Sequence, residues 1–154
     1  MMDVSQILSN LFVGSFPKSP EDIDRLHREG ITAVLNAQTD DDMDDWGVNW
    51  DRLESYYREV GIDVRRAPVR DFDPDDLRRQ LPACVDVLDE LLRGGRTVYV
   101  HCNMGVNRSP SIVIAYLHWV LGWDLEKATD HVMKCRSCDP YVDVIELASK
   151  DRKK

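Results

Sequence analysis

The residues whose types and spacing could do chemistry are Cys102 and Arg108, which are separated by the five residues from Asn103 to Asn107. The strand-like run Thr97 to Val100 precedes the cysteine, and an apolar helical pattern begins at Ser109-Pro110. Short loops that run from a strand into a helix point backbone N–H groups at an anion, and the helix dipole favours negative charge there. The spacing therefore predicts an anion-binding loop that carries a nucleophile.

The residue types within this loop fit a phosphate ester. The field that binds the anion also stabilises a thiolate, so Cys102 should be ionised and nucleophilic at neutral pH. Arg108 offers a rigid fork of donors that matches two phosphate oxygens at once, and Gly105 allows the tight turn that brings the backbone close to a ligand. In the alternative interpretation, Cys102 is a buried apolar residue and Arg108 is a surface charge.

The rest of the chain predicts the scaffold that must position these residues. Strand-like runs alternate with helical patterns, so we expect an α/β fold with a central, mainly parallel sheet, helices on both faces and a helix-rich C-terminal third. Because the chain has 154 residues and no visible linker, we expect residues 1–154 to form a single domain. The expected strands are 11–13, 31–35, 62–69 and 97–100. The expected helices are 20–28 with Ser19 as its cap, 50–60, one carrying Leu81 to Leu92 with a kink or its start at Pro82, 109–120, 124–135 and 140–150.

Composition and charge exclude several classes of protein. The chain has 20 Lys and Arg against 28 Asp and Glu, a net charge of −8, which argues against broad binding to the backbone of nucleic acids. Its apolar runs are shorter than the ~20 residues that span a bilayer, and residues 1–13 lack the features of a secretory signal. Four cysteines in this length do not make a disulfide framework. We expect a cytoplasmic monomer that binds neither membranes nor nucleic acid.

Five aspartates crowd the segment from Thr39 to Asn49, around Met43 and Trp46. A metal-binding loop is one interpretation, but the segment lacks the spacing, the glycine and the terminal glutamate of an EF-hand. Charge runs are usually solvated, so we expect a solvated loop without metal or other cofactor.

The sequence His101-Cys102, five residues, Arg108-Ser109 resembles the phosphate-binding signature of cysteine-dependent protein tyrosine and dual-specificity phosphatases. The resemblance extends over nearly the whole chain to the plant starch-excess type of glucan phosphatase, a branch of the dual-specificity group. It implies the compact dual-specificity phosphatase fold and a two-step, metal-independent hydrolysis of phosphomonoesters. The matching segments include Val13-Gly14-Ser15, Pro20 to Asp24, Asp45 to Val48, Asp71 to Pro74, Leu81-Pro82-Ala83 and Arg136-Ser137-Cys138.

In such a reaction, the Cys102 thiolate attacks phosphorus while Arg108 and the loop amides hold the equatorial oxygens. The substrate-binding loop residues are then Asn103, Met104, Gly105, Val106 and Asn107. Ser109 would donate a hydrogen bond to the departing thiolate, cap the following helix, or do both. His101 would order the loop through hydrogen bonds to the backbone.

A sugar or serine alkoxide is a poor leaving group, so a general acid must protonate it. Asp71, Asp73, Asp75 and Asp76 all lie upstream of the loop, and the residues alone do not rank Asp71 above Asp73. The family's pattern implies Asp71, 31 residues before Cys102. Asp73, which precedes Pro74, is more typical of a helix cap.

Two substrate classes stay open. In glucan phosphatases, aromatic residues beside the pocket stack on sugar rings, and Trp46 and Phe72 occupy matching places, although both could instead be core or loop-anchoring aromatics. A phosphorylated glucan of the starch or glycogen type is therefore the first substrate hypothesis. The second is a phosphoprotein carrying phosphotyrosine, with less activity on phosphoserine or phosphothreonine. Five arginines could make the entrance of the site positive and attract such a substrate, or they could form a solvated face. They are Arg65, Arg66, Arg70, Arg78 and Arg79.

Two other classes of function are less consistent with the residues. A catalytically idle phosphate-binding module would not need a cysteine, an arginine and an aspartate together. Cys135-x-x-Cys138 could form a reversible disulfide, but a single such pair is weak for zinc. Cys84 falls near the apolar stripe of its helix, so we expect its side chain to be buried.

Overall fold

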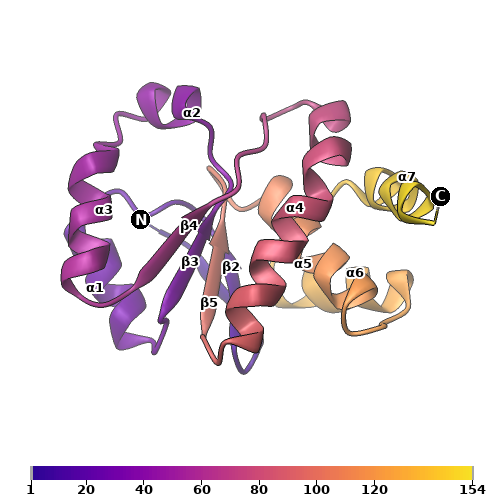
Figure 1. Ribbon diagram of the computed structural model, residues 1–154, viewed down its shortest axis with the longest axis horizontal. Coiled ribbons are helices and arrows are strands. Elements are labelled where there is room, and N and C mark those ends of the chain that lie inside the picture. Colours follow the sequence, from indigo (N-terminus) through magenta and orange to yellow (C-terminus); the bar gives the residue numbers. More distant parts are fainter. Residues whose placement is uncertain (1, 154) are drawn as a thin grey trace.

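The computed structural model describes residues 2–153, which form a five-stranded sheet covered by helices on both faces (Figure 1). The strand order is β1-β2-β5-β3-β4, in which β1 is antiparallel to β2 and the other neighbouring pairs are parallel. The mainly parallel α/β architecture predicted from the sequence is therefore confirmed. The strands are β1 (Val4–Leu8), β2 (Leu11–Gly14), β3 (Ala33–Asn36), β4 (Asp63–Arg66) and β5 (Val98–His101). The helices are α1 (Pro20–Arg28), α2 (Asp40–Asp45), α3 (Trp50–Glu59), α4 (Pro74–Arg93), α5 (Arg108–Trp119), α6 (Leu125–Cys135) and α7 (Val142–Arg152).

Side chains that alternate along each strand divide the core into two layers. In β5, Val98 and Val100 belong to one apolar cluster, whereas Tyr99 joins Ile23 of α1 and Tyr57 of α3 in the other. Figure 1 shows the same division, with α1 and α3 on one side of the sheet and α4 to α7 on the other. Because both faces are covered, the ends of the central strands are held firmly.

The carboxyl ends of β3, β4 and β5 lie at one edge of the sheet, the upper edge in Figure 1. Asn36 of β3 pairs with Arg66 of β4 and with His101 of β5, so the three chains leave the sheet at the same level. The first continues into α2, the second into the segment before α4, and the third into residues 102–107. Ligands of open α/β sheets bind at this edge.

The Asp-rich segment contains a helix, and the expectation of a solvated loop is wrong. Thr39 Oγ1 accepts a hydrogen bond from the Asp42 N–H, and the Asp42 carboxylate accepts one from the Thr39 N–H, at 3.1 and 2.9 Å. This reciprocal cap satisfies two backbone donors at the start of α2, and the acidic first turn suits the positive end of its dipole. The three-residue spacing of Thr39 and Asp42, rather than the charge of the Asp-rich segment, therefore decides that this segment is helical.

Three further elements differ from the expectations. Strand β1 is not predicted, because its five residues show no clean alternation and it forms as the hairpin partner of β2. Helix α4 begins at Pro74 behind an Asp73 cap, so Pro82 lies inside the helix rather than at its start. Ser19 stands at the N-cap of α1 without a side-chain cap bond. Across residues 2–153, no helix combines the length and apolar character needed to cross a membrane.

Candidate active site

In the loop between β5 and α5, every backbone carbonyl of residues 103–107 accepts a hydrogen bond. The bonds come from four residues in three different segments of the chain. They are Phe16 N–H to Asn103 O (2.9 Å), Arg136 Nη2 to Met104 O (3.0 Å), Arg136 Nε to Gly105 O (2.7 Å), Asp139 N–H to Val106 O (2.8 Å), and Ser111 N–H and Oγ to Asn107 O (3.1 and 2.7 Å). The loop backbone is therefore fixed from its outer side.

The N–H groups of the same five residues are left for a ligand. None of them donates a hydrogen bond to any group within residues 2–153. The Asn107 side chain, at the N-cap position of α5, makes no cap bond and instead donates to Asp139 O at 2.7 Å. Asn103 and Gly105 are buried and Asn107 is half-buried, and unpartnered donors at such positions normally mark a missing acceptor, so this loop fits an anion.

Gly105 and Gly14 permit the close approach that this loop requires. Gly105 has φ of +69°, a conformation that side chains rarely adopt, and an added Cβ would lie 2.5 Å from the Gly14 carbonyl carbon and 2.7 Å from Arg136 Nη2. A Cβ on Gly14 would collide with Asp3 O at 1.9 Å. The predicted role of Gly105 in a tight turn is consistent with this geometry.

Arg108 lies inside the loop with a fork of unused donors. The residue is only 1% exposed, which rules out the alternative of a surface charge. Its Nη1 donates to Asp42 Oδ2 and to Val69 O, both at 2.7 Å. Nη2 and Nε are buried and have no hydrogen-bond partner within residues 2–153, although Nε lies 3.3 Å from Asp71 Oδ1 as an ion pair. A planar pair of free N–H donors is suited to an oxyanion.

Asp42 is the site residue that the sequence reasoning missed. It accepts hydrogen bonds from Arg108, from the Thr39 N–H and from the Asn103 amide. Burial alone would raise the pKa of Asp42, but these partners hold that pKa below its ordinary value. The Thr39-x-x-Asp42 capping pattern was the available signal. The Asn103 Oδ1 accepts a hydrogen bond from Gln38 Nε2, so of Asn103 only the backbone is free for a ligand.

Cys102 Sγ lies 3.2 Å from Ser109 Oγ, close enough for a hydrogen bond. Helix α5 begins at Arg108, so Ser109 is in its first turn and the expected N-cap role is wrong. The His101 Nδ1–H donates to Cys102 O at 3.0 Å, in agreement with a role in ordering the loop. Burial lowers the pKa of His101 to about 4, so its ring is neutral at pH 7.

A cavity of about 240 Å³ lies over this loop. Its lining consists of Asp71, Phe72, Cys102, Asn103, Met104, Val106, Asn107 and Arg108. It therefore contains four of the five predicted loop residues, and Gly105 lies outside it. Asp71 is at the cavity wall, whereas Asp73 accepts a hydrogen bond from the Asp76 N–H at 3.0 Å and caps α4 as expected. Of Asp71 and Asp73, only Asp71 lines the cavity that contains Cys102.

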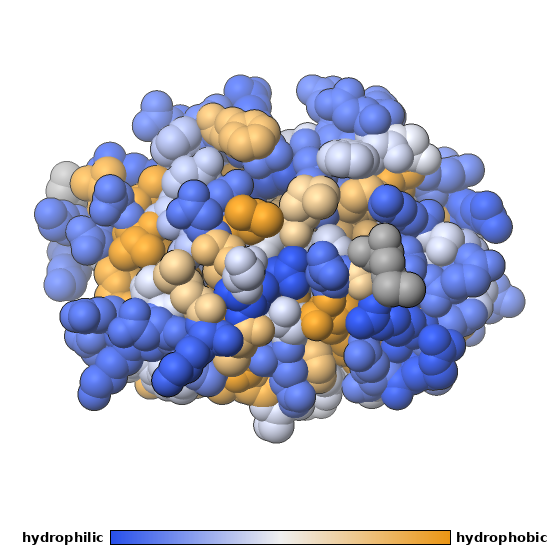
Figure 2. All heavy atoms as spheres, turned by 180° about the vertical axis from the view of Figure 1, so that it is seen from behind, coloured by the Kyte–Doolittle hydropathy of each residue, from blue (hydrophilic) through white to orange (hydrophobic). Residues whose placement is uncertain are grey.

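A groove of about 490 Å³ adjoins that cavity and shares Asp71, Phe72, Asn103 and Met104 with it. Trp46 is the C-cap of α2 and its ring packs, tilted by 49°, against buried Phe16 with 5.5 Å between ring centroids, yet it is 48% exposed. Phe72 is 79% exposed, so it is not a core aromatic. Seen from behind in Figure 2, the upper edge of the molecule is notched, with an apolar ring to the left of the notch and hydrophilic side chains on its right rim.

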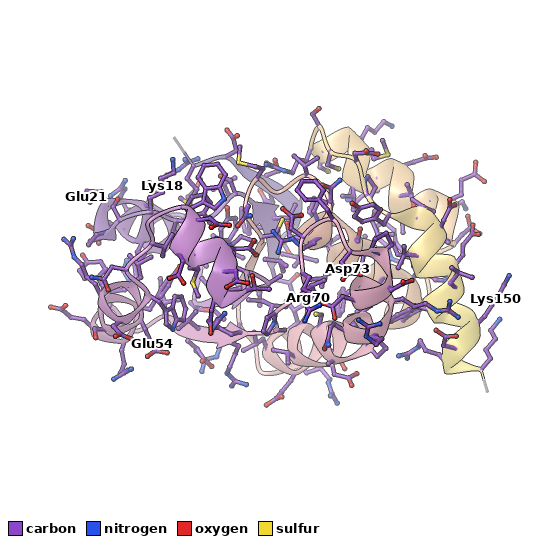
Figure 3. All side chains as sticks on the ribbon, turned by 90° about the horizontal axis from the view of Figure 1, so that it is seen from above. Lys18, Glu21, Glu54, Arg70, Asp73 and Lys150 are labelled. Carbon is purple, nitrogen blue, oxygen red and sulfur yellow. The ribbon has the colours of Figure 1, made fainter. Side chains whose placement is uncertain are left out.

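The five arginines considered for a positive entrance of the site do not form one free surface. Four of them pair with carboxylates: Arg65 with Asp63 and Glu90, Arg66 with Asp40, Arg78 with Asp151, and Arg79 with Asp76. Figure 3 labels Arg70 and Asp73, which both belong to the segment that leads from β4 into α4. The positive charges are therefore compensated locally, in keeping with the alternative of a solvated face.

The other three cysteines are free thiols. Cys84 is 1% exposed, as expected, and burial raises the pKa of its thiol to about 12. Burial also raises the pKa of Cys138, and Cys135 is half-buried at the end of α6. Cys102 is thus the cysteine that lines an anion-binding cavity.

Similarity to known proteins agrees with this geometry. The family described as "Dual specificity phosphatase, catalytic domain" matches residues 11–141, a range that contains the loop, Asp42 and Asp71. The chain belongs to the dual specificity phosphatase family. It is therefore a hydrolase, and the resemblance recognised from the loop is confirmed.

Two curated relatives are similar to most of this phosphatase chain. Phosphoglucan phosphatase DSP4, amyloplastic, of Castanea sativa is 37% identical over 147 residues, which are 94% of this chain and 39% of the relative. Laforin of Mus musculus is 37% identical over 158 residues, covering 96% of this chain and 48% of the relative. The phosphatase chain thus spans less than half of either protein. The solved structure of Tk-PTP in its active form has a TM-score of 0.77 at 21% identity, covering 96% of this chain and 94% of that one, which supports the fold.

Proposed function

We propose that this phosphatase hydrolyses phosphate monoesters of a phosphorylated glucan through a cysteinyl-phosphate intermediate. The observation that carries the proposal is the junction of two cavities. A small one of about 240 Å³ over Cys102 has room for a phosphoryl group, and it adjoins a groove of about 490 Å³ that is walled by Trp46 and Phe72. Exposed aromatic rings next to a phosphate cradle suit the apolar faces of sugar rings.

In the first step, the Cys102 thiolate attacks phosphorus, so an S–P bond forms and the P–O bond to the sugar breaks. Asp71 gives its proton to the leaving oxygen. The free Nη2 and Nε of Arg108 and the unpartnered N–H groups of residues 103–107 bind the equatorial oxygens, where charge develops in the transition state.

In the second step, the ionised Asp71 takes a proton from a water molecule whose oxygen attacks phosphorus. The S–P bond breaks and inorganic phosphate leaves. Ser109 Oγ, 3.2 Å from Cys102 Sγ, donates a hydrogen bond to the returning thiolate. Asp71 has lost and regained one proton, so the enzyme returns to its starting state. The choice of Asp71 is supported by its place in both cavities, and by the use of Asp73 as a helix cap.

The groove supports a glucan over a phosphoprotein. Phe72 has φ of +57°, which is strained for a bulky residue, and strain of this kind is commonly retained at ligand-binding sites. The Castanea sativa relative is named a phosphoglucan phosphatase. A phosphoprotein substrate would gain little from the arginines, because four of the five already have carboxylate partners.

The test compares phosphate release from phosphorylated amylopectin with hydrolysis of 4-nitrophenyl phosphate. Trp46→Ala and Phe72→Ala should each lower kcat/KM on amylopectin by roughly tenfold, since a ring stacked on a sugar contributes ~1 kcal/mol or somewhat more. The small aryl phosphate occupies only the inner cavity, so its kcat/KM should change by less than about twofold.

Met133→Ala is the matched control, because Met133 on α6 is as exposed as Trp46, at 48%, and does not line either cavity. It should change neither activity. Faster hydrolysis of a phosphotyrosine peptide than of amylopectin, with equal losses on both substrates in the two ring variants, would favour the phosphoprotein alternative.

A further inference from the structure

Arg136 follows α6 and reaches the phosphate-binding loop from behind. It is 9% exposed, and its Nε and Nη2 donate to the carbonyls of Gly105 and Met104 at 2.7 and 3.0 Å. Its Nη1 donates to Ser5 Oγ of β1 at 3.1 Å. One guanidinium therefore joins two consecutive loop carbonyls to the edge of the sheet, on the side away from the cavity over Cys102.

The planarity of the peptide bond gives this contact a consequence for the anion cradle. In a trans peptide, the C=O and the following N–H point in opposite directions, and no cis peptide occurs within residues 2–153. Holding the carbonyls of Met104 and Gly105 outward therefore holds the N–H groups of Gly105 and Val106 inward. Without Arg136, both peptide planes could turn and both donors would leave the cradle. Gly105, with φ of +69°, offers little resistance to such a turn.

The charge of Arg136 favours the same ligand. No carboxylate forms an ion pair with Arg136 within residues 2–153, and its partners there are carbonyl and hydroxyl oxygens. Burying a cation that forms no ion pair costs free energy, although Asp3 lines the same cavity as Arg136. A phosphoryl group or a thiolate on the other side of the loop reduces that cost, so the guanidinium adds to the field that attracts both.

We propose that Arg136 is a positioning residue of the phosphatase: it sets the N–H groups of Gly105 and Val106 toward the transferring phosphoryl group. This rests on the proposed function of the loop. Arginine is required because its Nε–Nη2 edge spans two carbonyls, whereas a lysine ammonium cannot hold both in one plane.

The experiment measures the affinities of orthovanadate and inorganic phosphate by calorimetry for wild type, Arg136→Ala and Arg136→Lys. Vanadate mimics the trigonal arrangement of the transferring group, so correctly placed N–H donors matter more for it than for phosphate. Arg136→Ala should weaken vanadate binding by roughly 10- to 100-fold and phosphate binding by less. Arg136→Lys should lie between wild type and Arg136→Ala.

Chemical rescue separates positioning from stability. Arg136 lines an open cavity of about 410 Å³, so millimolar guanidinium chloride should enter Arg136→Ala and restore part of the vanadate affinity, whereas sodium chloride should not. Arg25→Ala is the matched control, because Arg25 lines the same cavity and donates to Met2 O at 2.6 Å but does not contact the loop. It should bind both anions as wild type does.

Wild-type vanadate affinity in Arg136→Ala would overturn the proposal, as would equal losses for vanadate and phosphate with no rescue by guanidinium. If Arg136→Ala does not fold, Arg136→Lys carries the test, and wild-type affinity in that variant would contradict the need for a fork. Failure of the wild type itself to bind either anion would instead refute the proposed function of the loop.

Discussion

The loop from Cys102 to Asn107 and the groove beside it share an edge of the sheet, but their positions are fixed in different ways. Every carbonyl of residues 103–107 is hydrogen-bonded, and the Arg108 side chain inside the loop is held by Asp42 and Val69. The groove walls are Trp46 and Phe72, which are 48% and 79% exposed. The reaction therefore depends on many mutually dependent bonds, whereas the choice of substrate depends on a few replaceable side chains.

The largest effect on activity should come from replacing the nucleophile of the loop, Cys102. Cys102→Ser removes the nucleophile, so turnover of both amylopectin and 4-nitrophenyl phosphate should fall on the order of 10⁴-fold or more. The anion cradle stays in place, so calorimetry should still detect binding of inorganic phosphate. Retained turnover in this variant would rule out thiolate catalysis.

An intermediate effect should come from Asp71, which belongs to both regions because it lines the cavity and the groove. Asp71→Asn should lower kcat/KM on the sugar phosphate roughly 10²- to 10⁴-fold, because kcat/KM reports the first step and its alkoxide needs a proton, and lower kcat/KM on 4-nitrophenyl phosphate much less. Steady-state assays on the two substrates measure the ratio.

Asp73→Asn is the control for this leaving-group effect, since Asp73 caps α4 and is outside both cavities. It should lower the melting temperature slightly and change both activities by the same small factor. A selective loss on the sugar phosphate in Asp73→Asn, and not in Asp71→Asn, would transfer the acid role to Asp73.

The smallest effect on activity should come from His101, which supports the loop without taking part in proton transfer. The pKa of His101 is about 4 in the folded protein against about 6.5 unfolded. The unfolded chain therefore binds more protons between these values, and the free energy of unfolding should fall by up to ~3 kcal/mol as pH drops from 6.5 to 4.

His101→Asn keeps a donor for Cys102 O but cannot titrate. Urea unfolding of this variant should lose that part of the pH dependence, while kcat at pH 7 changes by less than about threefold. If the free energy of unfolding of His101→Asn depends on pH as steeply as that of the wild type, other groups cause the acid sensitivity. Asp42 contributes little in this window, because its pKa lies below its ordinary value and its contribution is lost mainly at lower pH.

The parts of the site that sequence could predict are those whose signal is local. Cys102 and Arg108 are set by their spacing between a strand and a helix, and Asp73 by its place before Pro74. The local pattern Thr39-x-x-Asp42 indicates only a helix cap, and the site roles of Asp42 and Arg136 depend on partners far along the chain: Arg108 is 66 residues from the first, and Gly105 is 31 residues from the second. Arg136 moreover binds backbone carbonyls, which carry no residue-specific pattern.

The fold shows the same division. Alternation and helical periodicity predict the central strands and most helices, since these depend on which side chains face the core. Strand β1 depends on pairing with β2, and α2 on one reciprocal cap within an acidic run. The cytoplasmic location, the monomeric state and the single-domain extent stay predictions.

The most direct test of the account is to identify the atom that carries phosphorus during turnover. Asp71→Asn lacks the base for the second step, so rapid acid quenching of its reaction with 4-nitrophenyl phosphate should trap the intermediate. Mass spectrometry should then find one phosphoryl group on the peptide containing Cys102, located on that cysteine, and none in Cys102→Ser. Burst release of nitrophenol with the phosphoryl group on another residue, or with no phosphorylated enzyme at all, would contradict the account.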